Sequence, residues 1–296
     1  MLREIRELFS FHGKLTPQMA RHDVHNVAGK AMRDLQQFGF EGIGGKRMLD
    51  LGCGQRFAFA LQCAAAGAKV TALDLDYVKP HFLPVALFHI AKHNGVKRAL
   101  KSMVRRIMWD SQYYRELEEN AGKPLRPYMS KINFVVADPT GGGYPLPSSS
   151  FDLIASNAVL EHVSDLEKFA QEVARLLDTG GYFYAVIHNF FSLSGGHNLD
   201  WTRPDENPPS AVPPWDHIRE NRFPVWVRLN RCKPEDYTTA FSQGLRILRF
   251  EGVGINHDAG ELEGEKLLTP EIAAELAEYP RELLLTRAWV MICKKE

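Results

Sequence analysis

The chain has 296 residues, of which 45% are hydrophobic and 24% charged, a composition typical of a globular protein. Lysine plus arginine equals aspartate plus glutamate at 36 each, so no overall charge favours nucleic acid or an anionic membrane. The sequence has no apolar run long enough to span a membrane and no signal-peptide core near its start. The cysteines form no CxxC pair and no metal-ligand cluster, so we expect a reduced, cytoplasmic protein without a bound metal: Cys53, Cys63, Cys232 and Cys293.

The stretch Arg47–Asp76 has the pattern of a strand, a glycine turn, a helix and a second strand. Residues 48–50 form a short apolar run that ends in an acid, and a tight turn with the sequence Gly-Cys-Gly follows at 52–54. Residues 57–66 are predicted to form a helix that ends at Gly67, and residues 69–73 a strand that leads into Asp74. A further helix is predicted upstream, over Val24–Phe38.

The strand–turn–helix–strand unit suits a nucleoside cofactor. Glycines allow the backbone to approach a ligand closely, and the following helix offers unpaired N–H groups. A carboxylate at the end of the second strand can accept hydrogen bonds from both ribose hydroxyls. By itself this unit fits a nicotinamide oxidoreductase equally well, and it also fits a parallel α/β core that binds no cofactor.

More than fifty residues separate this unit from the next strand, far more than a simple crossover needs. We interpret residues 78–131 as a helical insertion. A basic run at 97–106 contains five lysines and arginines and no acid. It is consistent with a solvated helix face, with contact to a phosphate-bearing substrate, or with peripheral contact to a membrane surface.

The second half alternates strands and helices. Strands are predicted at 132–137, 151–155 and 182–187, and the first of them leads into Asp138. The spacing of Ser164 and Glu167 predicts a capping box at the start of a helix that ends at Gly180–Gly181. This alternation favours a mostly parallel sheet with helices on both faces.

The pattern fails over residues 188–233, which contain six prolines and three of the five tryptophans. Because aromatic residues are rare in disordered tracts, we interpret this segment, the lid, as ordered but irregular. A helix is then predicted at 234–242 with Gly244 at its end, and a strand at 245–250. Thr269 is predicted to cap another helix, and residues 283–293 to form the last strand.

In this order the motifs resemble the class I S-adenosylmethionine-dependent methyltransferases, in particular the small-molecule methyltransferase domains. The matching stretches are LDLGCG at 49–54, ALDLD at 72–76, VVAD at 135–138, PLPSSSFDLIASNAVLEHV at 145–163 and ARLLDTGGYFYAVI at 174–187. The resemblance covers about residues 24–187 and 234–296. It implies one Rossmann-like, doubly wound α/β domain over residues 1–296, with seven strands, the last antiparallel, and S-adenosyl-L-methionine as cofactor.

The resemblance also implies roles for individual residues. The acid and the turn beside the methionine part of the cofactor are Asp50, Gly52, Cys53 and Gly54. Asp74 corresponds to the acid that binds the ribose, Asp138 to the acid that binds the adenine amino group with Pro139 beside the ring, and Asn157 to a backbone contact. Arg56 departs from the family, which often has a third glycine at this position.

Methyl transfer needs alignment of the acceptor behind the methyl carbon, and an oxygen acceptor also needs a base. The candidate bases are His188, at the end of the fifth strand, and His162, in the LEHV stretch. The lid supplies candidate substrate contacts: His197, Trp201, Trp215 and His217. Tryptophans beside polar groups suit a saccharide or a hydroxylated natural product, so an O-methyltransferase of a small acceptor is the favoured function. A partner-binding domain without catalytic activity is an alternative, and the sequence leaves the oligomeric state open.

Overall fold

The computed structural model describes residues 16–75, 83–204, 210–225 and 227–296. It divides into two compact units. Unit 1 is the described part of Met1–Pro139 with Tyr144–Leu146 and Ser150–Ala155, and unit 2 comprises Thr140–Gly143, Pro147–Ser149 and the described part of Ser156–Glu296. The prediction of one domain over 1–296 stays a prediction, and each unit is described by itself.

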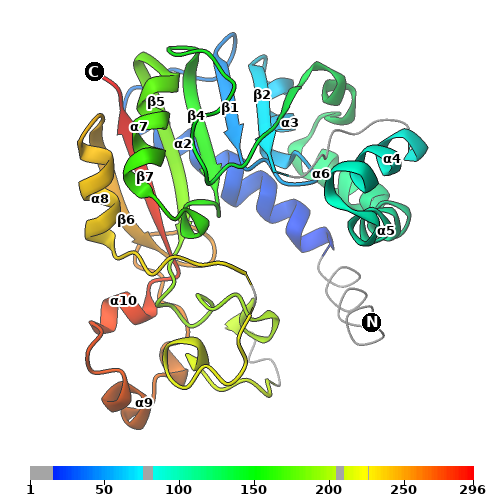
Figure 1. Ribbon diagram of the computed structural model, residues 1–296. Helices are drawn as coiled ribbons and strands as arrows, with labels where there is room; N and C mark the ends of the chain where they lie inside the picture. Colours follow the sequence, from blue (N-terminus) through cyan, green and yellow to red (C-terminus); the bar gives the residue numbers. More distant parts are fainter. Residues whose placement is uncertain (1–15, 76–82, 205–209, 226) are drawn as a thin grey trace. The chain divides into compact units, whose positions relative to one another are not determined.

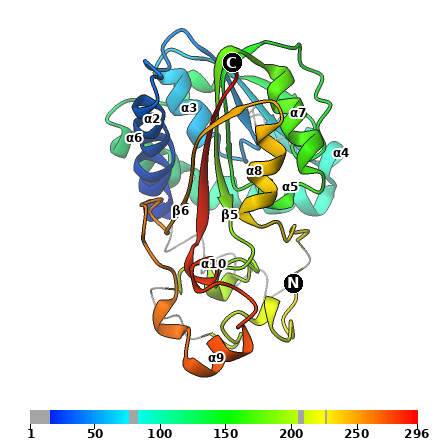
Figure 2. The same cartoon turned by 90° about the vertical axis from the view of Figure 1, so that its left-hand side faces the viewer.

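The strands form a seven-stranded sheet in the order β3-β2-β1-β4-β5-β7-β6. β7 runs antiparallel to both of its neighbours, whereas β1, β2 and β3 pair in parallel. This confirms the predicted fold class, a Rossmann-like α/β sheet with seven strands and an antiparallel last strand. Figure 1 shows β2, β1 and β4 as neighbouring arrows, and Figure 2 shows β7 between β5 and β6.

Unit 1 contains the predicted strand–turn–helix–strand stretch. The stretch forms β1 (Arg47–Leu51), α3 (Ala58–Ala65) and β2 (Lys69–Asp74). Unit 1 also contains β3 (Asn133–Val136). The register pairs Asp50 of β1 with Ala72 of β2, so that both strands end at the same edge. The upstream helix is longer than predicted, because it is already helical at residue 16 and continues through a π-helical turn, η1 (Asp23–Ala28), into α2 (Gly29–Gln37).

Residues 83–131 of the insertion are mostly helical: α4 (Leu83–Asn94), α5 (Val96–Arg105), η2 (Arg106–Asp110), α6 (Ser111–Ala121) and η3 (Arg126–Lys131). Gly95 and Gly122 separate these helices at φ 86° and 64°, values that glycine adopts without strain. Part of the basic run is engaged in an ion pair, because Arg105 Nε lies 3.2 Å from Asp110 Oδ1. Contact of the basic run with a membrane surface or with a phosphate-bearing substrate stays a prediction.

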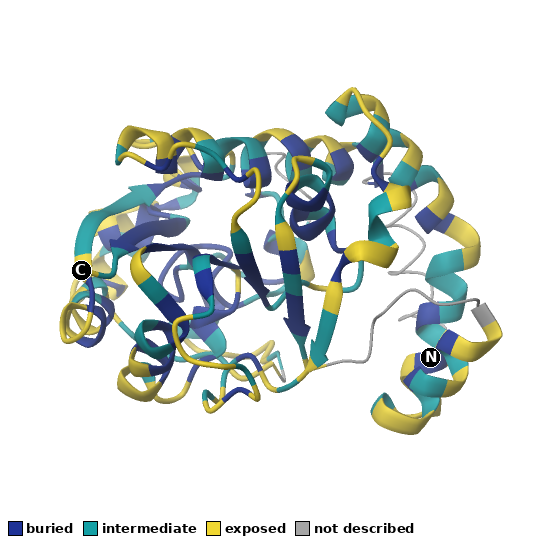
Figure 3. Ribbon diagram, turned by 90° about the horizontal axis from the view of Figure 1, so that it is seen from above, coloured by how far each residue is buried: buried dark blue, intermediate teal, exposed yellow. Residues whose placement is uncertain are grey.

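Unit 2 contains the long strand β5 (Leu177–His188), which pairs with β7 (Ala288–Lys294), and β6 (Arg246–Val253) at the edge. α7 (Leu166–Leu176) packs on β5, and α8 (Pro234–Ser242) packs on α7 and β6. Residues 181–187 of β5 and 288–293 of β7 are buried, whereas most of β6 is of intermediate exposure. Figure 3 shows the ribbon coloured by burial, with dark blue stretches in the strands. The remaining strand, β4 (Phe151–Asn157), has its last two residues in unit 2.

Several predicted boundaries in unit 2 are wrong. The cap of α7 is Asp165, whose side chain accepts from Lys168 N, and the helix ends at Leu176, so that Gly180 and Gly181 lie inside β5. The predicted helix over residues 234–242 is confirmed as α8, whose C-cap is Gln243. The predicted last strand begins as a helix, α10 (Arg281–Leu285), because its three leucines are strong helix formers that follow Pro280 at the N-cap. The Thr269 cap of α9 (Pro270–Glu275) is confirmed.

The described lid residues have little regular structure beyond the short turns η5 (Leu199–Trp201) and η7 (Asp216–Ile218). Another short turn, η4 (Leu160–His162), follows β4 and precedes α7. The lid is nevertheless ordered around its own core, which it shares with η8 (Glu265–Leu267), α9 and α10. The buried members of this core are Leu193, Trp201, Val212, Trp215, Leu268, Leu276, Leu284 and Leu285. Asp76, Pro208, Pro209 and Trp226, which belong to the sequence patterns above, lie outside the described residues. Among the helices that the structure describes, none has the length and apolar character to cross a membrane.

Candidate functional site

The glycine turn of unit 1 is tied to the end of β2. Gly52 N and Cys53 N donate to Leu73 O at 2.8 and 3.2 Å, and Gly54 N donates to Asp74 Oδ2 at 2.9 Å. Gly52 and Gly54 have φ values of 79° and 63°, which is the region that glycine adopts without strain. The turn and the acid predicted to bind the cofactor therefore form one connected structure.

Asp50 lies behind this turn rather than in the open. Its carboxylate is 4% exposed and accepts from Ala60 N at 3.2 Å, which anchors the first turn of α3. Burial raises the pKa of Asp50 to about 7, and the negative charge of Asp74 adds to the effect. This geometry favours a role for Asp50 in supporting the turn. The direct contact between Asp50 and the cofactor stays a prediction.

The remaining predicted cofactor residues lie at the ends of β3 and β4. Asp138 is exposed just after β3. The preceding residue, Ala137, donates its backbone N–H to Asp74 O at 3.1 Å, so the chain at Asp138 lies close to the chain at Asp74. Pro139 is buried, and its carbonyl accepts from Tyr144 Oη at 2.6 Å. Asn157 is exposed at the end of β4 and belongs to unit 2.

Arg56, at the position of the missing third glycine, turns toward the helical insertion. Its guanidinium lies 4.1 Å from the ring centroid of Tyr113, and its Nε lies 3.4 Å from Asp110 Oδ1. The next residue, Phe57, caps α3 with a left-handed φ of 52°. The Arg56 side chain therefore packs on η2 and α6 of unit 1.

Unit 2 brings together histidines that are far apart in the sequence. His188 ends β5, and its Nδ1 lies 2.9 Å from Nε2 of His197 in the lid. The other ring nitrogen of His188 lies 2.8 Å from Ser194 Oγ. Both nitrogens of this candidate base are therefore engaged by protein groups. His162 packs edge-on against His197, with ring centroids 5.4 Å apart.

A buried carboxylate completes the cluster. Glu161 is 1% exposed, and neither of its carboxylate oxygens has a hydrogen-bond partner among the described residues. Backbone N–H groups of Glu161 and His188 face the carboxylate without reaching hydrogen-bond geometry. Burial raises the pKa of Glu161 to about 8.

The same burial acts in the opposite direction on the histidines. It lowers the pKa of His188 well below its ordinary value, and the nearby Arg287 guanidinium lowers it further. It lowers the pKa of His197 to about 4. Both imidazoles are therefore neutral near pH 7, the form in which a ring nitrogen has a free lone pair.

Glu161, His188 and His197 each offer a ligand atom within 4.8 Å of the other two. The described residues therefore contain a cluster of side chains that could ligate a metal, which was not predicted from the sequence, and the expectation of no bound metal stays a prediction. His188 and His197 were candidates for other roles, but their proximity to Glu161 could not be predicted, because α7 and β5 lie between position 161 and His197 in the chain. Sequence reasoning also missed Ser194, whose role follows from its contact with His188.

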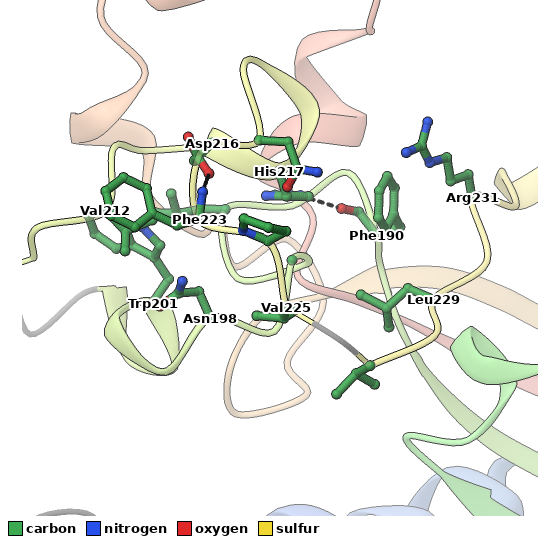
Figure 4. A pocket seen from close by; sticks show the side chains of 15 residues that line it. Phe190, Asn198, Trp201, Val212, Asp216, His217, Phe223, Val225, Leu229 and Arg231 are labelled. Atoms are coloured by element: carbon green, nitrogen blue, oxygen red, sulfur yellow. Dashed lines mark hydrogen bonds between the residues drawn. The ribbon is translucent and has the colours of Figure 1, made fainter. Parts of the chain in front are cut away.

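His217 lies on a separate cavity of about 160 Å³ within the lid (Figure 4). Its Nε2 lies 2.7 Å from Phe190 O, to which it donates, so that Nδ1 keeps a lone pair. Burial lowers the pKa of His217. Of the fifteen lining residues, nine are apolar: Phe190, Leu193, Trp201, Val212, Phe223, Pro224, Val225, Val227 and Leu229.

The two tryptophans predicted to contact substrate differ. Trp201 lines the cavity although it is 6% exposed, whereas Trp215 is fully buried in the lid core and does not line it. The expectation for Trp215 is corrected: its ring is fully buried in the lid core and presents no face to a ligand in this structure. The indole N–H of each ring lacks a partner among the described residues.

The sheet order, the glycine turn and the acids at the strand ends define a class I S-adenosylmethionine-dependent methyltransferase. A family model described as a methyltransferase domain matches residues 23–221, which is more than half of the chain. The chain belongs to this methyltransferase-domain family, and its cofactor is S-adenosyl-L-methionine. No curated protein sequence matches the chain.

Several solved structures are similar to it in fold. An S-adenosylmethionine-dependent methyltransferase from Mesorhizobium loti is 18% identical with a TM-score of 0.48, over 90% of this chain and 98% of the other. Geranyl diphosphate C-methyltransferase from Streptomyces coelicolor A3(2) is 12% identical with a TM-score of 0.48, over 90% and 80%. A putative methyltransferase complexed with the Trm112 activator, from Haloferax volcanii, is 16% identical with a TM-score of 0.46, over 93% and 97%. The family assignment depends on the family model and not on these structures.

Proposed function

We propose that the protein transfers the methyl group of S-adenosylmethionine to a hydroxyl oxygen of a small molecule with an apolar ring. The observation that carries the proposal is the lid cavity, which combines apolar side chains and polar groups with one histidine of fixed orientation. A cavity of about 150 Å³ holds a benzene ring, so a volume of about 160 Å³ fits one ring of an acceptor. Polar atoms contribute slightly more of the cavity's lining surface than apolar atoms, so the cavity suits either a hydroxylated natural product or a saccharide.

His217 is proposed as the base. Its Nε2–H is held by the Phe190 carbonyl, which leaves Nδ1 to accept the hydroxyl proton. Gly196 packs against the ring so closely that a Cβ there would lie 2.6 Å from Cγ of His217, so the ring cannot shift toward it. In the reaction the acceptor oxygen bonds to the methyl carbon, the carbon–sulfur bond breaks toward sulfur, and the proton passes to His217.

The two bases predicted from the sequence, His188 and His162, differ in whether a ring nitrogen is left to accept a proton. Both ring nitrogens of His188 are engaged, which favours a positioning role. Nδ1 of His162 lies 2.8 Å from Arg228 O, to which it donates, so that Nε2 is left as a proton acceptor. His162 is therefore the second candidate base.

An acceptor screen tests the proposal. The protein is incubated with S-adenosylmethionine and either phenols, other hydroxylated natural products or sugars, and both S-adenosylhomocysteine and the methylated product are measured. We expect O-methylation of a ring-bearing acceptor and a kcat reduced roughly 10²–10⁴-fold in His217→Gln, with a smaller change in KM. His25→Gln, at an exposed position, is the matched control.

Each alternative has its own signature in this experiment. Methylation at carbon, or a His217→Gln variant with unchanged kcat, would contradict the proposal. A loss of kcat confined to His162→Gln would assign the base to that residue instead. Binding of S-adenosylhomocysteine without turnover of any acceptor would support the partner-binding alternative.

A further inference from the structure

We propose that Glu161, His188 and His197 form a binding site for a divalent first-row transition metal. The three side chains come from η4, from the end of β5 and from the lid, and their ligand atoms lie within 4.8 Å of one another. All three belong to unit 2. The inference is independent of the acceptor proposed above, since it concerns binding and not turnover.

The carboxylate of Glu161 is the first argument. It is 1% exposed, and neither oxygen has a hydrogen-bond partner among the described residues. Buried polar atoms are almost always paired, so an unpaired buried carboxylate requires an explanation. A cation bound beside it would satisfy both oxygens at once.

The spacing of the two imidazoles is the second argument. His188 Nδ1 and His197 Nε2 are 2.9 Å apart. With metal–nitrogen bonds of about 2.0–2.1 Å, two nitrogens on one ion lie roughly 2.9–3.4 Å apart. The rings are therefore already spaced for one ion, and only the Glu161 carboxylate has to approach, by roughly 1–2 Å.

The orientation of His188 is the third argument. A histidine that binds a metal through one ring nitrogen usually donates its other N–H to a fixed partner. His188 Nε2 lies 2.8 Å from Ser194 Oγ, which leaves Nδ1 directed at His197. Ser194 is itself held, because its backbone N donates to Glu263 Oε1 at 2.8 Å, and buried Glu263 forms an ion pair with Arg287.

The ligand set selects the class of metal. Imidazole suits Zn²⁺, Fe²⁺, Co²⁺ and Ni²⁺, whereas Mg²⁺ and Ca²⁺ prefer oxygen ligands only. Two histidines and one carboxylate also leave at least one coordination position open. Gly196 and Asn198, the chain neighbours of His197, line the lid cavity, whereas His197 itself does not.

A rival explanation needs no metal. His188 and His197 would hydrogen-bond to each other, and Glu161 would stay protonated. In that arrangement both oxygens of the glutamic acid lack a hydrogen-bond partner. A bound metal would provide a partner for them. Metal titration separates the two explanations.

The experiment uses the full-length protein after treatment with a chelator and dialysis. Zn²⁺ binding is measured by calorimetry, and Co²⁺ is added as a probe whose visible absorption reports nitrogen and oxygen ligands. We expect one metal ion per chain, and at least tenfold weaker binding in Glu161→Gln and in His197→Gln. Ser194→Ala, which removes only the partner of His188, is expected to weaken binding 10–100-fold. Glu167→Gln and His25→Gln, both at exposed positions, are matched controls.

The stability of the unsubstituted protein provides a readout that does not depend on the folding of any variant. A metal that binds only the folded state raises the unfolding temperature in proportion to the logarithm of its concentration. An unfolding temperature that Zn²⁺ leaves unchanged would overturn the proposal. So would binding of the same strength in Glu161→Gln, His197→Gln and the controls, because the metal would then be held elsewhere.

Discussion

The guanidinium of Arg56 lies 4.1 Å from the centroid of the Tyr113 ring, and its Nε faces Asp110 at 3.4 Å. Tyr114 Oη donates to the carbonyl of Arg56 at 3.2 Å. Residues from η2 and α6 of the insertion thus hold the turn that leads into α3. A residue that departs from the glycine pattern of the family therefore packs the insertion against the turn that precedes α3.

Replacement of Arg56 should therefore affect stability more than cofactor binding. We expect Arg56→Ala to lower the free energy of unfolding by about 1–3 kcal/mol, since it removes a cation–π contact and leaves Asp110 with one fewer cationic partner. Arg56→Lys should retain part of this, because lysine keeps the charge but lacks the planar stacking group. Urea denaturation measures the change, and Arg222→Ala, at an exposed arginine, should lie within about 0.5 kcal/mol of wild type.

The same variants test whether the side chain lines the cofactor pocket. Calorimetry with S-adenosylhomocysteine should give dissociation constants within about threefold of wild type. A tenfold change in affinity with unchanged stability would show that Arg56 contacts the cofactor.

Asp74→Asn isolates the proposed ribose contact. The asparagine oxygen can still accept from Gly54 N, which Asp74 Oδ2 does now at 2.9 Å, so the turn should persist. The amide removes the charge and one acceptor site, so we expect affinity for S-adenosylhomocysteine to fall at least tenfold, or about 1.4 kcal/mol. Asp258→Asn, at an exposed acid, serves as the control. An unchanged affinity would remove Asp74 from the proposed set of cofactor residues.

The order of strands and most helices could be predicted because their signals are local. Residues 234–242 gave the bounds of α8, and Thr269 with Pro270 gave the start of α9, since cap chemistry and helical period are contained within a few residues. The errors occurred where neighbouring residues compete. Ser164 and Asp165 are both favourable N-cap residues. Only the structure shows that Asp165 is the cap, because its side chain accepts from Lys168 N.

The candidate site was predictable only where a family motif spans it. The glycine turn and Asp74 lie in one stretch, and the structure connects them through Gly54. Glu161 and His197 are joined by folding alone, with β5 and the lid between them. Trp215 was misjudged because aromatic content does not tell a core residue from one that lines a pocket.

The pKa of Asp50 predicts a pH-dependent stability. Because its folded-state pKa of about 7 lies above the ordinary value of 3.8, the folded state favours the protonated form. The stabilisation is complete below pH 3.8 and is lost as pH rises through 7. Relative to Asp50→Asn, wild type should lose about 2–3 kcal/mol of unfolding free energy between pH 5 and 7.5.

Urea denaturation of both proteins at these two pH values measures the difference. Asparagine keeps an acceptor for Ala60 N, so the variant should fold. Parallel changes in the two proteins would mean that Asp50 is ionised throughout, and that other buried groups cause the pH dependence.

Asn189 holds the start of the lid to the C-terminal elements of unit 2. Its Nδ2 donates to Leu283 O and Thr286 O at 2.7 and 2.6 Å, and its Oδ1 accepts from Phe191 N at 3.0 Å. The residue is 3% exposed. Asn189→Asp keeps the shape but turns an acceptor toward two carbonyl oxygens, which should cost about 3 kcal/mol or more of unfolding free energy.

Asn189→Ala provides the comparison, because it leaves the same carbonyls unpaired without adding a charge. It should be destabilising by about 2 kcal/mol, less than the aspartate, and Asn133→Asp at an exposed position of β3 should have a small effect. Chemical denaturation ranks the three variants. If the aspartate variant were as stable as wild type, the amide of Asn189 would not be donating to these carbonyls, and the lid would be held by its apolar core alone.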